Sequence, residues 1–206
     1  MSREDLAERR GAETTVYQPA EDSALLARAA VDAIKTGDHV LEVGAGSGWV
    51  AESVAVETGS SVVATDLNPA ACRQAQERSA ALDSEDRFEV VTADLVSGFA
   101  DETFDVVLFN PPYLPTDPDN EWDDWMERAL SGGESGRAVI EPFLDTVGRV
   151  LVPGGRALLL VSSLAGYDEV VSYAEARGFL TEKAVEESYP FETLTVVEMT
   201  NSNKLV

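Results

Sequence analysis

The sequence predicts an α/β domain in which a seven-stranded, mostly parallel sheet is covered by helices on both faces and ends in an antiparallel C-terminal strand. Two observations predict this class. Apolar, strand-like runs alternate with helical patterns along the chain, which is typical of parallel sheets with crossover helices. The last two runs are joined through a few residues around Pro190, so they are close enough to pair as a hairpin.

Local patterns place each element. Between Pro19 and Lys35, apolar side chains recur at helical spacing, and Gly37 ends this helix. The expected strands are residues 39–43, 61–65, 87–92, 104–109, 156–162, 180–188 and 193–200. The other expected helices are residues 47–58, 69–81, 136–150 and 167–177. We expect the polar residues 1–15 to be mobile and residues 16–206 to form a single domain.

The composition indicates a cytoplasmic protein with a full core. The chain has 206 residues, of which 44% are hydrophobic, and this is enough for one domain. No run approaches the ~18 consecutive apolar residues of a membrane span, and residues 1–11 lack the apolar core of an export signal. A single cysteine, Cys72, and a single histidine, His39, exclude a disulfide within the chain, a Cys-based or His-based metal site and a His-based triad.

The charge is strongly acidic, with 38 acidic and 15 basic residues and a net charge of −23. Such a chain has no basic footprint for direct contact with nucleic acid, which it would repel. Alternatively, dispersed carboxylates keep a halophilic protein hydrated in multimolar salt. The depletion of lysine along the whole chain favours the halophilic interpretation. At ~1 M salt the screening length is only about 3 Å, so the charge indicates a habitat more than a substrate.

The tetrapeptide Asn110-Pro111-Pro112-Tyr113 follows the apolar run 104–109. It places two hydrogen-bond acceptors at the carboxyl tip of a strand, the Asn110 side-chain oxygen and the Pro111 carbonyl, and the two prolines have no N–H to compete for them. Two fixed acceptors suit a planar –NH2 group, and Tyr113 can stack on the group that carries it. The simpler alternative is a proline-rich turn that leaves a strand.

A glycine-rich turn with Gly44, Gly46 and Gly48 follows the first expected strand and leads into a helix. Glycines there let a ligand approach the main chain at the mouth of a parallel sheet. The turn departs from the dinucleotide-binding pattern G-x-G-x-x-G, because Trp49 stands where the third glycine would fall. Glu42 precedes the turn.

Two further acids, Asp66 and Asp94, close the next two apolar runs. An acid at the first of these strand ends is placed to accept both ribose hydroxyls of a nucleoside. Each acid alone could be a helix cap or a solvated turn. Together with the glycine turn and the tetrapeptide, however, they form an ordered series of signals at strand ends.

This order resembles the class I (Rossmann-like) S-adenosyl-L-methionine-dependent methyltransferases, and within them the HemK-type amide methyltransferases. Residues 16–23, 132–137 and 192–194 are similar to the archaeal and eukaryotic branch that methylates the glutamine of the Gly-Gly-Gln motif in class I release factors. The resemblance covers roughly residues 16–200. The sequence departs from the family at Gln18, where Glu is expected, and in the unusually acidic residues 117–125.

The resemblance implies an S-adenosyl-L-methionine-dependent protein (glutamine-N5) methyltransferase that has no metal of its own. The residues it implies for catalysis are Asn110, Pro111 and Tyr113. Those implied for cofactor binding are Glu42, Gly44, Gly46, Gly48, Asp66, Asp94 and Asn110. Those implied for substrate binding are Asn110, Pro111, Pro112, Tyr113, Gly133 and Arg137.

Several alternatives remain open from the sequence. A nucleic-acid adenine N6-methyltransferase would use the same tetrapeptide but needs a base-flipping surface or an added domain. A protein lysine methyltransferase and a non-catalytic cofactor-binding subunit are the others. Trp122 and Trp125 form either one face of a short helix or part of a lid. Residues 132–137 are either a helix lead-in capped by Ser135 or a loop on the substrate side.

A partner is expected at residues 88–92. In the fold that the resemblance implies, this strand lies at the sheet edge, because the chain crosses back to the centre at the next strand. The strand has no Pro or Lys to blunt the edge, and such an edge invites strand addition by another chain. The resemblance implies a small zinc-binding methyltransferase activator protein, so we predict a one-to-one heterodimer with zinc on the partner. The alternative is a monomer whose own loops cover the edge.

Overall fold

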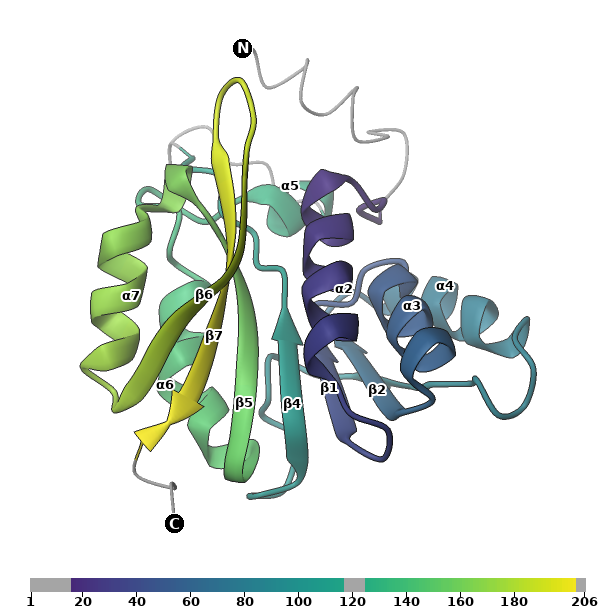
Figure 1. Ribbon diagram of the computed structural model, residues 1–206. Coiled ribbons are helices and arrows are strands. Elements are labelled where there is room, and N and C mark those ends of the chain that lie inside the picture. Colours follow the sequence, from purple (N-terminus) through teal and green to yellow (C-terminus); the bar gives the residue numbers. More distant parts are fainter. Residues whose placement is uncertain (1–15, 117–124, 203–206) are drawn as a thin grey trace.

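The computed structural model describes residues 16–116 and 125–202. Its sheet has seven strands in the order β3-β2-β1-β4-β5-β7-β6 (Figure 1). The strands are β1 His39–Val43, β2 Ser61–Asp66, β3 Glu89–Thr92, β4 Phe104–Phe109, β5 Leu151–Ser162, β6 Phe179–Ser188 and β7 Thr193–Asn201. The predicted fold class is confirmed. The division into a mobile segment, 1–15, and one domain, 16–206, stays a prediction, since residues 1–15 lie outside the described residues.

Strand directions fix where a ligand can bind. β1 pairs in parallel with β2 and β4, β2 with β3, and β4 with β5. β7 lies antiparallel between β5 and β6, which confirms the predicted C-terminal hairpin. From β1 the chain moves outward to β2 and β3 and then returns to place β4 on the other side of β1. The carboxyl ends of β1 and β4 therefore flank a topological switch point, where open α/β sheets bind their ligands.

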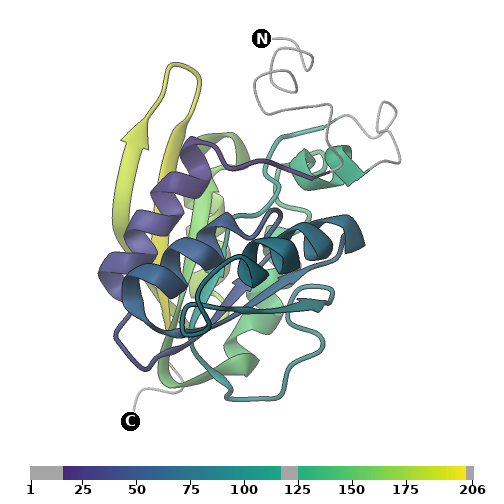
Figure 2. The ribbon, with the colours of Figure 1, turned by 90° about the vertical axis from the view of Figure 1, so that its right-hand side faces the viewer.

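Helices cover both faces of the sheet. They are α2 Glu21–Ala33, α3 Trp49–Thr58, α4 Pro69–Ala80, α5 Trp125–Leu130, α6 Ile140–Val150, the 3-10 helix η2 Ser163–Ala165 and α7 Tyr167–Glu175. α2, α3 and α4 lie on one face, and α6 and α7 lie on the other (Figures 1 and 2). This double cover explains why most of β1 and β4, and residues 157–162 of β5, are buried. The 3-10 helix η2 is an addition to the predicted elements, and α5 begins at Trp125, where a short helix was one of two interpretations.

The observed bounds correct two predictions. β5 starts at Leu151 rather than at residue 156: Leu151 pairs with Phe104, and pairing resumes where Arg156 meets Val106. The Pro-Gly-Gly sequence between these two points is an irregularity inside the strand, and its composition made it resemble a turn. Similarly, β3 starts at Glu89 rather than at residue 87.

The lead-in to α6 is longer than predicted. The helix begins at Ile140 rather than at residue 136, because Gly136 has a φ of 76°, outside the helical region. Ser135 does not cap this helix, since its hydroxyl accepts the Arg137 N–H at 3.3 Å instead. A side chain at position 136 would also place its Cβ 2.7 Å from the Tyr113 carbonyl oxygen. The lead-in therefore packs directly on the backbone of the tetrapeptide.

Other sequence features have a plain structural outcome. Cys72 is buried in α4. In residues 16–116 and 125–202, no helix is long and apolar enough to cross a membrane, and no group of three or more His, Cys, Asp or Glu side chains could hold a metal ion. Trp125 is the first residue of α5. Trp122 and the acidic segment 117–124 lie outside the described residues, so the two interpretations of the tryptophan pair stay open.

Candidate active site

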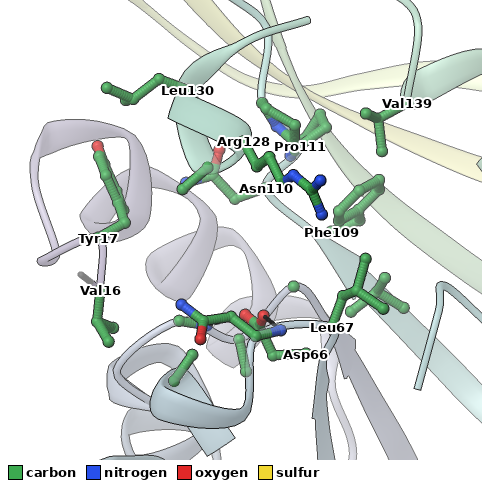
Figure 3. A pocket seen from close by; sticks show the side chains of 18 of the residues that line it. Val16, Tyr17, Asp66, Leu67, Phe109, Asn110, Pro111, Arg128, Leu130 and Val139 are labelled. Carbon is green, nitrogen blue, oxygen red and sulfur yellow. Dashed lines mark hydrogen bonds between the residues drawn. The ribbon is translucent and has the colours of Figure 1, made fainter. Parts of the chain in front are cut away.

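A large cavity opens at the switch point, beyond the carboxyl ends of the first four strands (Figure 3). Its volume is about 850 Å³, within the usual range for a small-molecule site. The segment before α2 and the helix α5 complete its wall. The loops after β1, β2, β3 and β4 contribute residues 43–47, 66–68, 93–95 and 109–114.

The glycine loop after β1 is tied to the end of β2. One carboxylate oxygen of Asp66, Oδ2, accepts the Gly46 N–H at 2.8 Å, and the other, Oδ1, accepts the Asn68 N–H at 2.8 Å. Burial raises the pKa of the Asp66 carboxyl, although these backbone hydrogen bonds partly lower it. Each carboxylate oxygen can accept a second hydrogen bond. Asp66 can therefore hold the loop and still bind hydroxyl groups of a ligand.

Glu42 lies at the floor of the cavity, near the end of β1. It is only 4% exposed, and within the described residues its Oε2 is buried without a hydrogen-bond partner. Burial raises the pKa of the Glu42 carboxyl to about 8, opposed by a backbone hydrogen bond at Ala51 and increased by the nearby charge of Asp66. A cationic ligand group beside this carboxyl would favour its ionised form and so lower its pKa.

The tetrapeptide forms the wall opposite Asp66 (Figure 3). The side-chain oxygen of Asn110, Oδ1, is buried and has no hydrogen-bond partner in the part of the chain that the structure describes. Pro111 is buried beside it, Pro112 also lines the cavity, and Tyr113 is 3% exposed. Leaving a buried acceptor unpaired costs about 1–3 kcal/mol, so this oxygen is poised to accept a donor that the cavity admits.

Two residues before and within α2 join this wall, and sequence reasoning assigned them no role. The Asp22 carboxylate accepts hydrogen bonds from the hydroxyls of Tyr17, at 2.7 Å, and Tyr113, at 3.4 Å. All three residues line the cavity. The sequence signal was present in residues 16–23, but the tie to Tyr113 joins residues that are 91 positions apart, and no local pattern reveals such a contact.

The helix α5 forms a further part of the cavity wall. The Leu114 N–H donates to the Leu130 carbonyl at 3.0 Å, and the Gly132 N–H donates to the Leu114 carbonyl at 2.9 Å. These bonds hold α5 to the chain just beyond the tetrapeptide, and Gly133 follows on the same wall. Figure 3 shows Arg128 extending from α5 into the cavity. The sequence offered a short helix at Trp125 as one of two interpretations, but did not predict its place in the cavity wall.

Two of the residues predicted for the site, Gly48 and Arg137, do not line the cavity. Gly48 precedes α3, and a Cβ there would lie 2.8 Å from the Ala75 Cβ, so it allows the close packing of α3 on α4. Arg137 donates from Nη1 to the Ala165 carbonyl at 2.6 Å and pairs with Glu141 at 3.4 Å. Neither residue lines the cavity. In the structure they serve helix packing and loop support, and their contacts with cofactor and substrate stay predictions.

The remaining predicted residues do meet at the cavity. Gly44, Gly46 and Asp66 lie on one wall, and Asp94 is an exposed residue at the end of β3 beside them. The side chains of Asn110 and its neighbours lie across from them. The order of signals in the sequence therefore corresponds to one continuous site.

Comparison with known proteins connects this geometry to a family. Residues 20–122 match the methyltransferase small domain. A putative protein N5-glutamine methyltransferase of Methanocaldococcus jannaschii is 37% identical over 88% of this chain and 90% of its own length. The chain belongs to the HemK-type protein N5-glutamine methyltransferases. Human methyltransferase HEMK2 is 33% identical over 94% of this chain and 93% of its own length.

A solved structure of the same family has the same fold. The complex of E. cuniculi Mtq2 with Trm112 is described as responsible for methylation of the eRF1 translation termination factor. A chain of this complex is 30% identical, covers 92% of our chain and 100% of its own, and superposes with a TM-score of 0.74.

S-adenosyl-L-methionine is the cofactor of this methyltransferase family, and the cavity fits it. The cofactor carries a sulfonium and an ammonium group, and the cavity presents the buried, unpaired Glu42 oxygen and the partly buried Asp66 carboxylate. The volume of about 850 Å³ admits a nucleoside with an amino-acid side arm. The donor set and the space of the site therefore suit the group that the family requires.

Proposed function

We propose that this methyltransferase modifies the side-chain amide of the glutamine in the Gly-Gly-Gln motif of a class I release factor. The relatives named above support this substrate class. The observation that carries the proposal is the Asn110 Oδ1 in the cavity wall, which is buried and has no hydrogen-bond partner among residues 16–116 and 125–202. Because translation termination takes place in the cytoplasm, we also propose that location.

Asn110 and Pro111 would orient the glutamine. An amide nitrogen is a poor nucleophile, since its lone pair is delocalised into the carbonyl. Accepting both N–H bonds, at Asn110 Oδ1 and at the Pro111 carbonyl, would point the nitrogen at the reacting centre. Orientation of this kind can supply roughly 7 kcal/mol or more of rate enhancement. The rigid proline backbone keeps both acceptors in place before the substrate arrives.

The other residues of the tetrapeptide would hold the substrate stem. Pro112 and Tyr113 line the cavity beside Asn110, so the ring of Tyr113 can pack against the glutamine side chain and favour a cationic centre. The bound cofactor supplies a methyl group already activated by its sulfonium. No residue of this chain therefore has to remove a proton before attack.

The opposite wall would position the cofactor. Asp66 would accept the ribose hydroxyls, Gly44 and Gly46 would lie along the methionine part, and Asp94 would lie at the adenine. Glu42 would face a cationic group, because its carboxyl is buried and lacks a partner for Oε2 within the described residues. These assignments cover the predicted cofactor residues other than Gly48, which packs α3 on α4, and Asn110, which we assign to the substrate amide.

The test separates methyl transfer from cofactor binding. Asn110→Ala should abolish methylation of a release factor while leaving the dissociation constant of S-adenosyl-L-methionine, measured by calorimetry, within about threefold of wild type. Asn201→Ala is the matched control, since it removes the same side chain at the end of β7, away from the cavity. Undiminished transfer by Asn110→Ala would refute the proposal.

We further propose that a small activator protein, with zinc in the partner, binds the β3 edge. β3 pairs with β2 alone and is an outermost strand of the sheet. Val91 is 38% exposed, and Glu89 and Thr92 are also exposed. Phe88 is no longer part of this edge, because its N–H and carbonyl are both bound by the Ser79 hydroxyl. The proposed interface is therefore Glu89–Thr92.

A proline scan tests the strand pairing. Ala93 donates its N–H to the Asp66 carbonyl at 3.2 Å, so the N–H of Val91, two residues earlier, also faces β2. The N–H of Val90 then faces outward. Val90→Pro should abolish co-purification with the activator and keep the fold, whereas Val91→Pro should destabilise β3 itself. A folded Val90→Pro variant that still binds the activator would contradict this interface.

A further inference from the structure

Asp22 links two parts of the active site that are distant in sequence. It is the second residue of α2 and is 2% exposed. Its Oδ2 accepts the Tyr17 hydroxyl at 2.7 Å and the Tyr113 hydroxyl at 3.4 Å, while its Oδ1 accepts the Ser23 N–H at 2.7 Å. One buried carboxylate therefore joins the segment before α2 to the tetrapeptide after β4.

The chemistry of this contact favours a fixed geometry. A buried carboxylate is costly unless it is hydrogen-bonded, and hydrogen bonds to an ionised acceptor are stronger than neutral ones. The Tyr17 hydroxyl, at 2.7 Å, makes the stronger of the two hydrogen bonds to Asp22, and the Tyr113 hydroxyl, at 3.4 Å, makes the weaker one. With its hydroxyl held there, Tyr113 has one end of its ring anchored outside the reacting centre, and Tyr17 holds the preceding segment against the same cavity.

We propose that Asp22 is a positioning residue for methyl transfer, which fixes the ring of Tyr113 beside the acceptor nitrogen and fixes Tyr17 on the same wall of the cavity. The inference rests on the proposed function, because it takes Tyr113 as part of the substrate site. On this account the ring of Tyr113 contacts the substrate, and its hydroxyl serves only to hold the ring.

A simpler role for Asp22 would be a negative charge at the start of α2, which favours the helix dipole. Glu21 provides the matched control for that role. It lies in the same first turn and carries the same charge, but it is exposed and does not line the cavity. A dipole effect should respond similarly to Glu21→Gln and Asp22→Asn, whereas positioning should respond to Asp22→Asn alone.

The experiment compares the turnover number, the KM for release factor and the dissociation constant of S-adenosyl-L-methionine. Asp22→Asn and Tyr113→Phe should each lower kcat about 10- to 100-fold, the scale of a small misplacement of reacting groups. Cofactor affinity should change by less than about threefold, because the change lies in transfer rather than in binding. Glu21→Gln should behave as wild type.

The double variant Asp22→Asn/Tyr113→Phe gives the decisive comparison. If the two residues act as one unit, its kcat should be no lower than that of the worse single variant. Wild-type kcat in Asp22→Asn, or losses that multiply in the double variant, would overturn the inference. If Asp22→Asn does not fold, Tyr113→Phe still tests the tie, because it removes only the hydroxyl, and wild-type kcat there overturns it.

Tyr113→Ala separates this inference from the proposed function. An active Tyr113→Ala enzyme would overturn the positioning role together with the proposed role of the Tyr113 ring, and would leave the amide substrate, which rests on Asn110, as proposed. An inactive Tyr113→Ala enzyme combined with fully active Asp22→Asn would overturn only the positioning role and leave the substrate site as proposed.

Discussion

The amino ends of β1 and β4 pair their polar groups with one another, whereas the carboxyl ends of the same strands leave buried polar atoms unpaired. At the amino end, the Asp105 carboxylate accepts the His39 N–H at 2.8 Å. The His39 ring nitrogen Nδ1 lies 3.1 Å from the Thr103 carbonyl oxygen, and the ring packs on Phe104 with 4.7 Å between centroids. These groups of β1 and β4 therefore have protein partners without a ligand.

The carboxyl end is different. Among the described residues, four buried side-chain polar atoms lack a hydrogen-bond partner, and three of them lie at the ends of β1, β2 and β4: Glu42 Oε2, Thr65 Oγ1 and Asn110 Oδ1. The fourth belongs to Arg156, whose guanidinium also donates to the Ala33 carbonyl. Unpaired buried groups oppose folding. This difference indicates that the amino end of the sheet contributes to stability, whereas the carboxyl end is arranged for binding.

The largest expected effect lies at the amino end. Phe104 is 1% exposed and packs on both His39 and Phe99, so Phe104→Ala should lower the free energy of unfolding by about 3–5 kcal/mol. Cofactor affinity of the folded variant should stay near wild type. Denaturant unfolding would measure the stability, and calorimetry would measure the cofactor affinity. A large loss of affinity would contradict the claim that the two ends of the sheet have separate roles.

The next largest expected effect is the pH dependence of the free energy of unfolding that results from Glu42. Its pKa is raised from 4.5 to about 8 in the folded protein, so the native state favours the protonated form. The stability that this gives is complete below the unfolded pKa and is lost as the pH rises through about 8. Glu42→Gln cannot ionise, so the cofactor-free variant should gain roughly 2–4 kcal/mol over wild type between about pH 5 and pH 9.

Thermal unfolding at both pH values measures this difference. Glu57→Gln serves as the control, because Glu57 is an exposed acid in α3. If the stability of wild type and of Glu42→Gln changes with pH in the same way, the buried carboxyl does not oppose folding. The claim that the carboxyl end of the sheet is built for binding would then lose one of its supporting observations.

Asp66 should produce an intermediate effect, on affinity rather than on the core. Asp66→Ala should weaken S-adenosyl-L-methionine by about 1–3 kcal/mol, the value of hydrogen bonds to a charged acceptor. Titration calorimetry would measure it. Wild-type affinity would mean that the carboxylate serves only to hold Gly46 and Asn68.

The smallest expected effect tests whether an exposed ion pair contributes to the stability of the amino end. Asp101 pairs with Arg149 at 2.7 Å, but the Asp101 side chain is 73% exposed. Asp101→Asn should therefore change the free energy of unfolding by less than about 1 kcal/mol, and the change should vanish near 1 M salt, where screening is strong. A larger, salt-resistant change in denaturant unfolding would show that charge, not apolar packing, holds this end.

The sequence predicts the strands and most of the site because their signals are local. Asp66 and Asn110 directly follow or end apolar runs, so strand ends could be recognised without knowledge of packing. The start of β5 could not be recognised, because Pro153 and the glycines after it look like a turn, and only pairing with β4 shows that Leu151 already belongs to the strand.

Contacts between distant segments were the other limit. The tie from Asp22 to Tyr113, and the place of Arg128 in the cavity, depend on tertiary structure. Conversely, Gly48 and Arg137 matched the expected pattern in sequence, but the fold uses them for helix packing and for binding the Ala165 carbonyl. A motif therefore indicated where the cavity lies, while the contacts of each residue in it required the structure.

The most direct test of the central claim is to locate the transferred methyl group. The protein, with its activator if required, would be incubated with isotopically labelled S-adenosyl-L-methionine and either a class I release factor or RNA, and the label would be mapped by mass spectrometry. We predict one methyl group on the glutamine of the Gly-Gly-Gln motif, and none when Asn110→Ala replaces wild type. Label on adenine or on lysine, with the glutamine unmodified, would contradict the account.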